Sequence, residues 1–183
     1  MNLLETFYHT KCKSDKEANN TWSHKYISSF YEEKIGYKKN DKINILEIGI
    51  QYGYSLKLWQ DYFINAEIYG FDINNQLQIN FNSNVHTKFF NAYSNEALEY
   101  LKNLNIKFDI IIDDGPHSIE SQDYICKNYK QFLKSDGILF IEDIHIDKYK
   151  KLHQANPEFK IIDLSNNAFT DGHCIVFYYE NGV

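Results

Sequence analysis

The sequence predicts an α/β fold in which a mainly parallel sheet is covered by helices on both faces. Segments rich in β-branched and aromatic residues alternate with segments of helical spacing over most of the chain. The central runs INILEIGI, FDIIID and GILFIEDI are almost continuously apolar, which is typical of parallel strands buried on both sides. The 183 residues, 43% of them apolar, suit one domain core and are too few for a second full domain.

Seven segments have the composition and length of strands. They are residues 44–50, 66–73, 87–92, 108–113, 137–144, 159–164 and 174–180. Helical spacing between the first five strands predicts a connecting helix after each of the first four. The last two strands have no helix-like segment between them. They are therefore expected to form an antiparallel hairpin at one edge of the sheet.

The predicted helices cover the sheet and precede it. Those between strands span residues 55–63, 75–81 (a short piece), 95–104 and 118–133. Residues 2–37 also have helical spacing, with Trp22 and Tyr26 placed to dock on the sheet. Residues 1–40 are therefore expected to form an N-terminal helical region, and residues 41–183 the α/β core of a single domain.

Composition excludes several classes of protein. A formal charge of −6 argues against non-specific binding to nucleic acid or to anionic membranes, since phosphate contacts need clustered positive charge. No stretch approaches the roughly 20 apolar residues that span a bilayer. Residues 1–10 lack the features of a secretory signal, so a cytoplasmic location is expected. Cys12, Cys126 and Cys174 are widely spaced and form no C-x-x-C pair, which indicates packing rather than zinc binding.

A glycine-containing turn between the first strand and its helix is the sharpest local signal. Glu47, Gly49, Gly53 and Ser55 belong to it, and the two glycines let the backbone turn sharply and approach a ligand. The following helix offers unpaired N–H groups to a carboxylate or phosphate. Asp72 ends the second strand, where a carboxylate can accept both hydroxyl protons of a ribose. The pattern predicts a nucleotide-type cofactor at the carboxyl ends of the strands.

Two kinds of cofactor fit this geometry. A dinucleotide site usually reads G-x-G-x-x-G, and the sequence has G-x-x-x-G instead, with Glu47 two residues before the first glycine. The pattern E-x-G-x-x-x-G, followed by an acidic residue at the end of the second strand, resembles class I methyltransferases that use S-adenosylmethionine. Ordinary turn glycines would be the alternative, but Asp72 at the expected place argues against it.

Acidic side chains end the fourth and fifth strands. Asp113 and Asp114 close one strand, and Glu142 and Asp143 close the other. Adjacent parallel strands lie about 4.8 Å apart, so these carboxylates are expected to converge. Such charges demand protonation or a cation, and a set of oxygen donors suits a hard ion such as Mg²⁺. Strand alternation sends Asp113 and Asp114 to opposite faces, so only one of them is expected to be a ligand.

His117 follows Asp114 by three residues and is placed to act as a base. A neutral imidazole can take a hydroxyl proton, and a neighbouring metal ion makes that transfer feasible near neutral pH. The competing interpretations are a turn-capping Asp114, a surface His117 and a solvated strand end at Glu142 and Asp143. Three unrelated non-catalytic roles would have to fall together by chance at adjacent strand ends. The grouping of these residues therefore favours a catalytic cluster.

Several motifs together resemble the metal-dependent sugar O-methyltransferases of macrolide biosynthesis. Proteins described as cephalosporin hydroxylases share them. In chain order the motifs are KSDK from Lys13, HKY from His24, ILEIGIQYGYSLKLWQDYF, IYGFDI, IIDDGPH and LFIED. The resemblance covers roughly residues 11–145. It implies a seven-stranded Rossmann-like sheet in the order 3-2-1-4-5-7-6 with the last strand antiparallel.

The resemblance also implies site residues and an activity, which is methyl transfer from S-adenosylmethionine to a sugar hydroxyl. Asp114, Glu142 and Asp143 would hold Mg²⁺, and His117 would be the base. The residues expected to bind S-adenosylmethionine are Glu47, Gly49, Gly53, Ser55, Asp72, Tyr93 and Asp113. Asp72 would hold the ribose. The usual Gly-Asp-Gln-like segment near the adenine is replaced by residues 91–94, Asn-Ala-Tyr-Ser.

The acceptor and the partners are expectations of a coarser kind. The macrolide enzymes carry extra lid or N-terminal elements for which 183 residues leave little room, so a nucleotide-linked sugar or a glycan end is expected as acceptor. A catechol-type O-methyltransferase, a nicotinamide-dependent oxidoreductase and a catalytically silent cofactor-binding module are the alternatives. A homodimer is expected from fold analogy alone.

Overall fold

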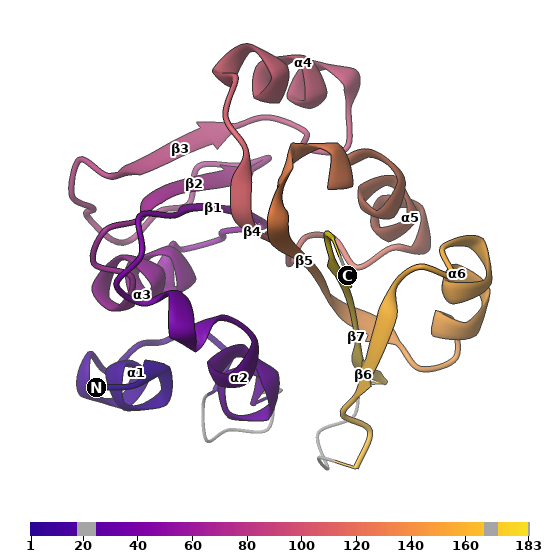
Figure 1. Cartoon of the computed structure of the whole chain (residues 1–183), viewed down its shortest axis with the longest axis horizontal. Coiled ribbons are helices and arrows are strands. Elements are labelled where there is room, and N and C mark those ends of the chain that lie inside the picture. The colour runs from indigo at the N-terminus through magenta and orange to yellow at the C-terminus, as the bar shows by residue number, and fades with distance from the viewer. Residues whose placement is uncertain (18–24, 167–171, 183) are drawn as a thin grey trace.

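The computed structural model describes residues 1–17, 25–166 and 172–182, and their strands form one mixed sheet (Figure 1). The strand order is β3-β2-β1-β4-β5-β7-β6, which confirms the predicted order. The strands are β1 Asn44–Ile48, β2 Glu67–Asp72, β3 Val85–Phe89, β4 Phe108–Asp113, β5 Leu133–His145, β6 Lys160–Asp163 and β7 His173–Glu180. The pairs among β1 to β5 are parallel. β7 is antiparallel to both β5 and β6, as predicted for the edge hairpin.

Helices cover both faces of the sheet (Figure 1). On one face lie α1 Leu3–His9, a π-helix Ile27–Tyr31, α2 Glu32–Ile35, a 3₁₀ turn Gly36–Lys38 and α3 Tyr54–Tyr62. On the other lie α4 Asn95–Leu104, α5 Ile119–Asn128, a 3₁₀ turn Lys130–Phe132 and α6 Tyr149–Ala155. Successive strand residues serve opposite cores, since Ile45 packs in the first and Leu46 in the second. Because β1 and β4 are buried on both faces of the sheet, most of their side chains are apolar.

The helical prediction for residues 75–81 was wrong, and one helix of the structure was not predicted. Residues 75–81 form no helix, because the Gln78 N–H donates to the Tyr52 carbonyl at 3.1 Å and so leaves the helical pattern. Tertiary packing of Leu77 and Phe81 on the first core outweighs their helical spacing. Helix α6 was not predicted, because its lysines suggested a solvated segment. Its single buried side chain, Leu152, packs on the second core.

The N-terminal region is less regular than its spacing predicts. Residues 11–17 are irregular chain between α1 and the π-helix, and Trp22 and His24 lie outside the described residues. Tyr26 and Phe30 pack in the first core, as expected for a docked segment. Across the ranges that the structure describes, every helix is too short or too polar to cross a bilayer.

Gly49 ends the first strand segment at a point of close backbone approach. Its φ of +84° is left-handed, and a Cβ atom there would lie 2.0 Å from the carbonyl oxygen of Asp114. The loops after β1 and β4 therefore touch through backbone, and only glycine fits between them. This contact sets the spacing of the two loops that carry the predicted site residues.

We predict that Gly49→Ala lowers the free energy of unfolding by more than about 2 kcal/mol, since it combines left-handed strain with a backbone clash. Urea unfolding measures the change. Gly36→Ala is the control, because its Cβ would meet only the flexible carboxylate of Glu32 and the Tyr62 hydroxyl. Equal stability of the two variants would contradict the packing argument.

Candidate functional site

A pocket of about 770 Å³ opens at the carboxyl ends of β1, β2 and β4. Gly49, Ser55, Asp72 and Tyr93 are among its lining residues. The two oxygens of the Asp72 carboxylate accept backbone N–H groups of Gln51 at 2.9 Å and Asn74 at 3.0 Å. Asp72 is thus fixed at the pocket wall. The pocket is large enough for a nucleoside cofactor.

The other three residues predicted to bind cofactor do not line this pocket. Glu47 is completely buried, and its carboxylate accepts the Trp59 indole N–H at 2.9 Å. Gly53 is the N-cap of α3 with a φ of +86°, and its N–H donates to the Ile50 carbonyl at 2.7 Å. Asp113 accepts the Tyr93 hydroxyl at 2.6 Å. Of the three, Asp113 is tied to the pocket wall through Tyr93, and direct contact of all three with cofactor stays a prediction.

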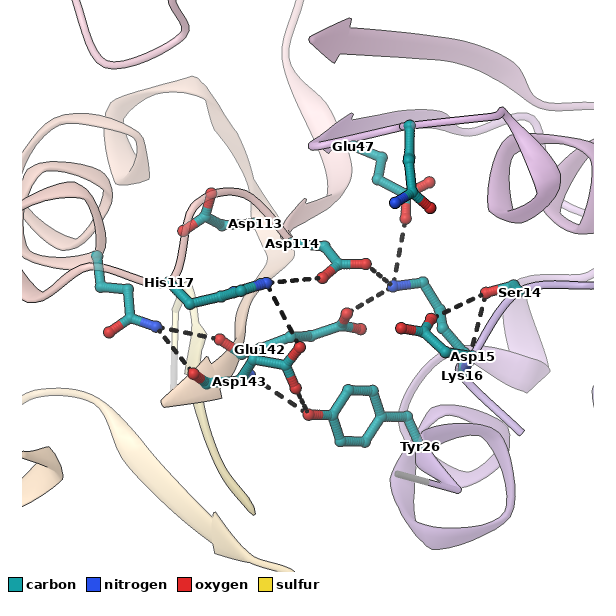
Figure 2. A network of polar contacts seen from close by, with 12 residues as sticks. Ser14, Asp15, Lys16, Tyr26, Glu47, Asp113, Asp114, His117, Glu142 and Asp143 are labelled. Atoms are coloured by element: carbon teal, nitrogen blue, oxygen red, sulfur yellow. Dashed lines mark hydrogen bonds and ion pairs between the residues drawn. The ribbon is translucent and has the colours of Figure 1, made fainter. Parts of the chain in front are cut away.

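A buried lysine lies among the predicted acidic residues (Figure 2). The Nζ atom of Lys16 is 2.9 Å from Asp114 Oδ2, 2.5 Å from Glu142 Oε2 and 3.3 Å from Glu47 Oε1. Its side chain is 0% exposed. Burial by itself lowers the pKa of a lysine, but attraction by Asp114, Glu142 and Glu47 raises the pKa of Lys16 well above its ordinary value. Lys16 is therefore expected to stay protonated inside the site.

Glu142 faces this lysine rather than the pocket. One of its oxygens contacts Lys16, and the other accepts the hydroxyl hydrogen of Tyr31. Burial raises the pKa of Glu142 well above its ordinary value, because Lys16 offsets only part of the cost of burying the charge. Glu142 thus shares Lys16 with Asp114, while both of its oxygens are engaged by the N-terminal region, and its metal binding stays a prediction.

Asp114, His117 and Asp143 form a second, more open cluster beside Lys16 (Figure 2). One potential ligand atom from each lies within 4.8 Å of the other two. His117 Nε2 is 3.9 Å from Asp114 Oδ1 and 3.6 Å from Asp143 Oδ2. Asp114 and His117 also line the large pocket. The pocket and the cluster thus share a wall, which is formed by these two residues.

The backbone of this cluster is unusual at two positions. His117 has a φ of +53° and Asp143 a φ of +54°, values that cost a residue with a side chain roughly 1–2 kcal/mol. Asp143 lies where the pairing of β5 with β7 is irregular, between Ile141 and Ile144. The Gln122 amide holds this irregularity by donating to the carbonyl oxygens of residues 142 and 143, at 3.2 and 3.4 Å. Such strain at converging polar groups is typical of a functional site.

The N-terminal region supplies residues that the sequence did not assign to the site. Besides Lys16, these are Tyr26, which precedes the π-helix, and Tyr31, which ends it; their hydroxyl groups donate to Asp143 and Glu142. The packing of Phe30 and Tyr31 on Phe140 of β5 brings these hydroxyl groups to the acidic residues. The KSDK motif, which contains Lys16, was the available signal, but its sequence does not show which carboxylates the lysine contacts.

Two further histidines lie near His117, although the sequence gave them no role. The ring of His173 is centred 6.1 Å from that of His117 and 5.1 Å from that of His145. His145 ends β5 and His173 begins β7, so the strand pairing explains their proximity. The three rings extend the polar cluster to the end of β5 and the start of β7.

Comparison with known proteins defines the family. A family model described as a methyltransferase domain matches residues 46–144, which is more than half of the chain. The chain belongs to this methyltransferase family. The match runs from β1 to the end of β5 and so includes the glycine turn, the pocket wall and the acidic residues.

Curated relatives are sugar O-methyltransferases that act on tetracenomycin and mycinamicin compounds, in line with the resemblance of the motifs. A tetracenomycin rhamnosyl 3′-O-methyltransferase from Streptomyces olivaceus is 25% identical over 70% of the chain, and mycinamicin VI 2″-O-methyltransferase from Micromonospora griseorubida is 28% identical over 50%. The aligned segments make up 35% and 25% of those proteins. The MycE methyltransferase of the mycinamycin pathway, solved with Mg and SAH, superposes with a TM-score of 0.74 at 17% identity. That match covers 99% of the chain and 55% of MycE and establishes the shared fold.

The buried Asp113 provides a pH test of the site. Burial raises its pKa from 3.8 to about 7, so the folded protein keeps a proton there that the unfolded chain has already released. The stability from this proton is complete below the unfolded pKa and is lost as the pH rises through about 7. We predict that the metal-free protein loses about 2 kcal/mol more stability between about pH 5 and about pH 8 than Asp113→Asn does.

Urea unfolding at both pH values, in the presence of a chelator, measures this difference. Asp136→Asn is a suitable control, since Asp136 is exposed and pairs with Lys38 away from the pocket. An identical pH dependence for the original protein and Asp113→Asn would show that Asp113 is ionised in the fold.

Proposed function

We propose that the protein is an S-adenosylmethionine-dependent O-methyltransferase that acts on a sugar hydroxyl with the help of a divalent cation. The observation that carries the proposal is the shared wall: Asp114 and His117 belong both to the pocket and to the polar cluster. A methyl donor in the pocket would therefore lie next to a base. The activities of the curated relatives, which methylate the 3′ oxygen of a rhamnosyl-tetracenomycin and the 2″ oxygen of mycinamicin VI, support a sugar as acceptor.

The pocket residues fit S-adenosylmethionine. Asp72, held by two backbone N–H groups, can accept hydrogen bonds from the ribose hydroxyls. Gly49 and Ser55 line the part of the pocket proposed for the methionine end of the cofactor. Tyr93 lines the part proposed for its adenine ring. Tyr93 is oriented by its hydrogen bond to Asp113. These roles follow from the pocket lining and from the resemblance.

The open cluster fits a hard divalent cation. Its proposed donors are one carboxylate oxygen each from Asp114 and Asp143, which lie within 4.8 Å of each other and of a ring nitrogen of His117, the residue proposed as the base. When bound, Mg²⁺ would supply charge that lowers the pKa of an acceptor hydroxyl and hold neighbouring acceptor oxygens. Asp114 and Asp143 are the residues proposed to hold it. Glu142, the third predicted ligand, would join them only if its carboxylate also reached the open side.

His117 is the proposed base. About a third of its side chain is exposed, so an acceptor hydroxyl can approach the ring from the pocket. The imidazole would take the hydroxyl proton as the oxygen attacks the methyl group, and the methyl donor would leave as the neutral thioether. Asp114 Oδ1 and Asp143 Oδ2 lie 3.9 and 3.6 Å from Nε2 of this ring, which is near but beyond hydrogen-bond distance. Alignment of donor and acceptor would supply much of the rate enhancement.

Methyl-labelled S-adenosylmethionine tests the proposal directly. With Mg²⁺ and a panel of nucleotide sugars and glycosides, we expect label in a sugar product and loss of transfer when the cation is chelated. His117→Gln and Asp114→Asn are each expected to slow transfer by at least about 100-fold, while S-adenosylhomocysteine binds within a few-fold of its original affinity. Transfer undiminished in both variants would contradict the mechanism.

Two controls separate the alternatives. Asp72→Ala is expected to weaken S-adenosylhomocysteine binding by about 10-fold or more, because a ribose hydroxyl loses its acceptor. Calorimetry with NAD should show no binding, and a catechol panel should take up no label. Binding of NAD in place of S-adenosylhomocysteine, or transfer to catechols alone, would favour an oxidoreductase or a catechol-type enzyme.

A further inference from the structure

The two aspartates of the open cluster use their oxygens unequally. Asp114 directs Oδ2 to Lys16 Nζ at 2.9 Å and Oδ1 toward His117 Nε2 at 3.9 Å. Asp143 directs Oδ1 to the hydroxyl of Tyr26 and Oδ2 toward His117 Nε2 at 3.6 Å. In each carboxylate one oxygen is held from the N-terminal region, and the other faces the imidazole (Figure 2).

The groups that hold the rear oxygens are themselves firmly placed. The Lys16 side chain is fully buried and also contacts Glu142 and Glu47. The Tyr26 hydroxyl additionally accepts the backbone N–H of Asp143 at 3.3 Å, and its ring packs on Phe30 at 5.4 Å between centroids. Both residues are about 98–99% buried.

An aspartate carboxylate turns easily about its last side-chain torsion, which has a broad energy minimum. Fixing one oxygen of this planar group fixes the other as well. We propose that Lys16 and Tyr26 are positioning residues that orient Asp114 and Asp143, so that one oxygen of each is presented beside His117 to a divalent cation. This inference rests on the proposed function, since it concerns the same cation.

Lys16 has two conceivable effects on a bound cation, and they differ in sign. As a nearby positive charge it would repel the cation, so its removal would tighten binding. As a positioning residue it orders the carboxylate, so its removal weakens binding. The geometry favours the second effect, because Lys16 occupies Oδ2 of Asp114 and leaves Oδ1 toward the open side.

Mn²⁺ titration followed by electron paramagnetic resonance tests the proposal on the full chain saturated with S-adenosylhomocysteine. Tyr26→Phe keeps the ring and removes only the hydroxyl, and we expect the Kd for Mn²⁺ to rise about tenfold. The affinity for S-adenosylhomocysteine without metal should stay within about twofold, which a general loss of structure would not permit. Tyr62→Phe is the matched control, because the buried Tyr62 hydroxyl donates to the Gly36 carbonyl away from the cluster.

Lys16→Met supplies the second test, with Lys38→Met as its control, since Lys38 is also largely buried but pairs with Asp136. We expect Lys16→Met to weaken Mn²⁺ binding despite the loss of a positive charge. Tighter binding would overturn the proposal and make Lys16 a competing cation. If Lys16→Met does not fold, Tyr26→Phe decides alone.

The outcomes also separate this inference from the proposed function. If the original protein binds Mn²⁺ and both variants bind it equally well, the positioning role is wrong and the metal-assisted function stands. If the original protein binds no Mn²⁺ in the presence of S-adenosylhomocysteine, both proposals fail.

Discussion

The site depends on one buried ammonium group enclosed by carboxylates. Lys16 contacts side chains from the ends of β1, β5 and the loop after β4, and so joins the cofactor side to the acidic cluster. Removing one partner of a buried ion pair typically costs about 3–5 kcal/mol, because the other charge is left uncompensated. Here the remaining partners would be several buried acids. Without the lysine, carboxylates this close would have to take up protons or move apart.

This arrangement makes the N-terminal region part of the site rather than only a cover for the sheet. The pairs that Lys16 makes with Asp114 and Glu142 span 98 and 126 residues of sequence. Tyr26 and Tyr31 add hydroxyl donors from the same region. The final orientation of the acidic residues therefore depends on contacts with the docked N-terminal region. Folding of the sheet and assembly of the site are linked in this way.

Much of the fold could be predicted because its signals are local. Continuous apolar runs identified β1, β4 and β5, and the absence of a helix between the last two strands identified the edge hairpin. Residues 75–81 misled because their spacing suits a helix, whereas Leu77 and Phe81 pack on the first core in an irregular chain. Helix α6 was hidden by its charged residues. In both cases tertiary contacts outweighed the local pattern.

The site could be predicted only in part, for a related reason. The order of strands brings Asp114 and Asp143 together, and the turn chemistry marks Gly49 and Asp72. The partners of each carboxylate oxygen depend instead on a residue 98 positions away and on an irregularity in β5, neither of which has a periodic signal. Strand alternation correctly separated Asp113 from Asp114. It could not show that Glu142 turns toward Lys16.

The most direct test of the central claim is a crystal structure with S-adenosylhomocysteine and Mn²⁺, in which anomalous scattering locates the ion. The account predicts an ion coordinated by Asp114 Oδ1 and Asp143 Oδ2, next to the bound thioether, while Lys16 keeps its contacts with Asp114 Oδ2 and Glu142. An ion at the place of the Lys16 ammonium, with that side chain displaced, would contradict it.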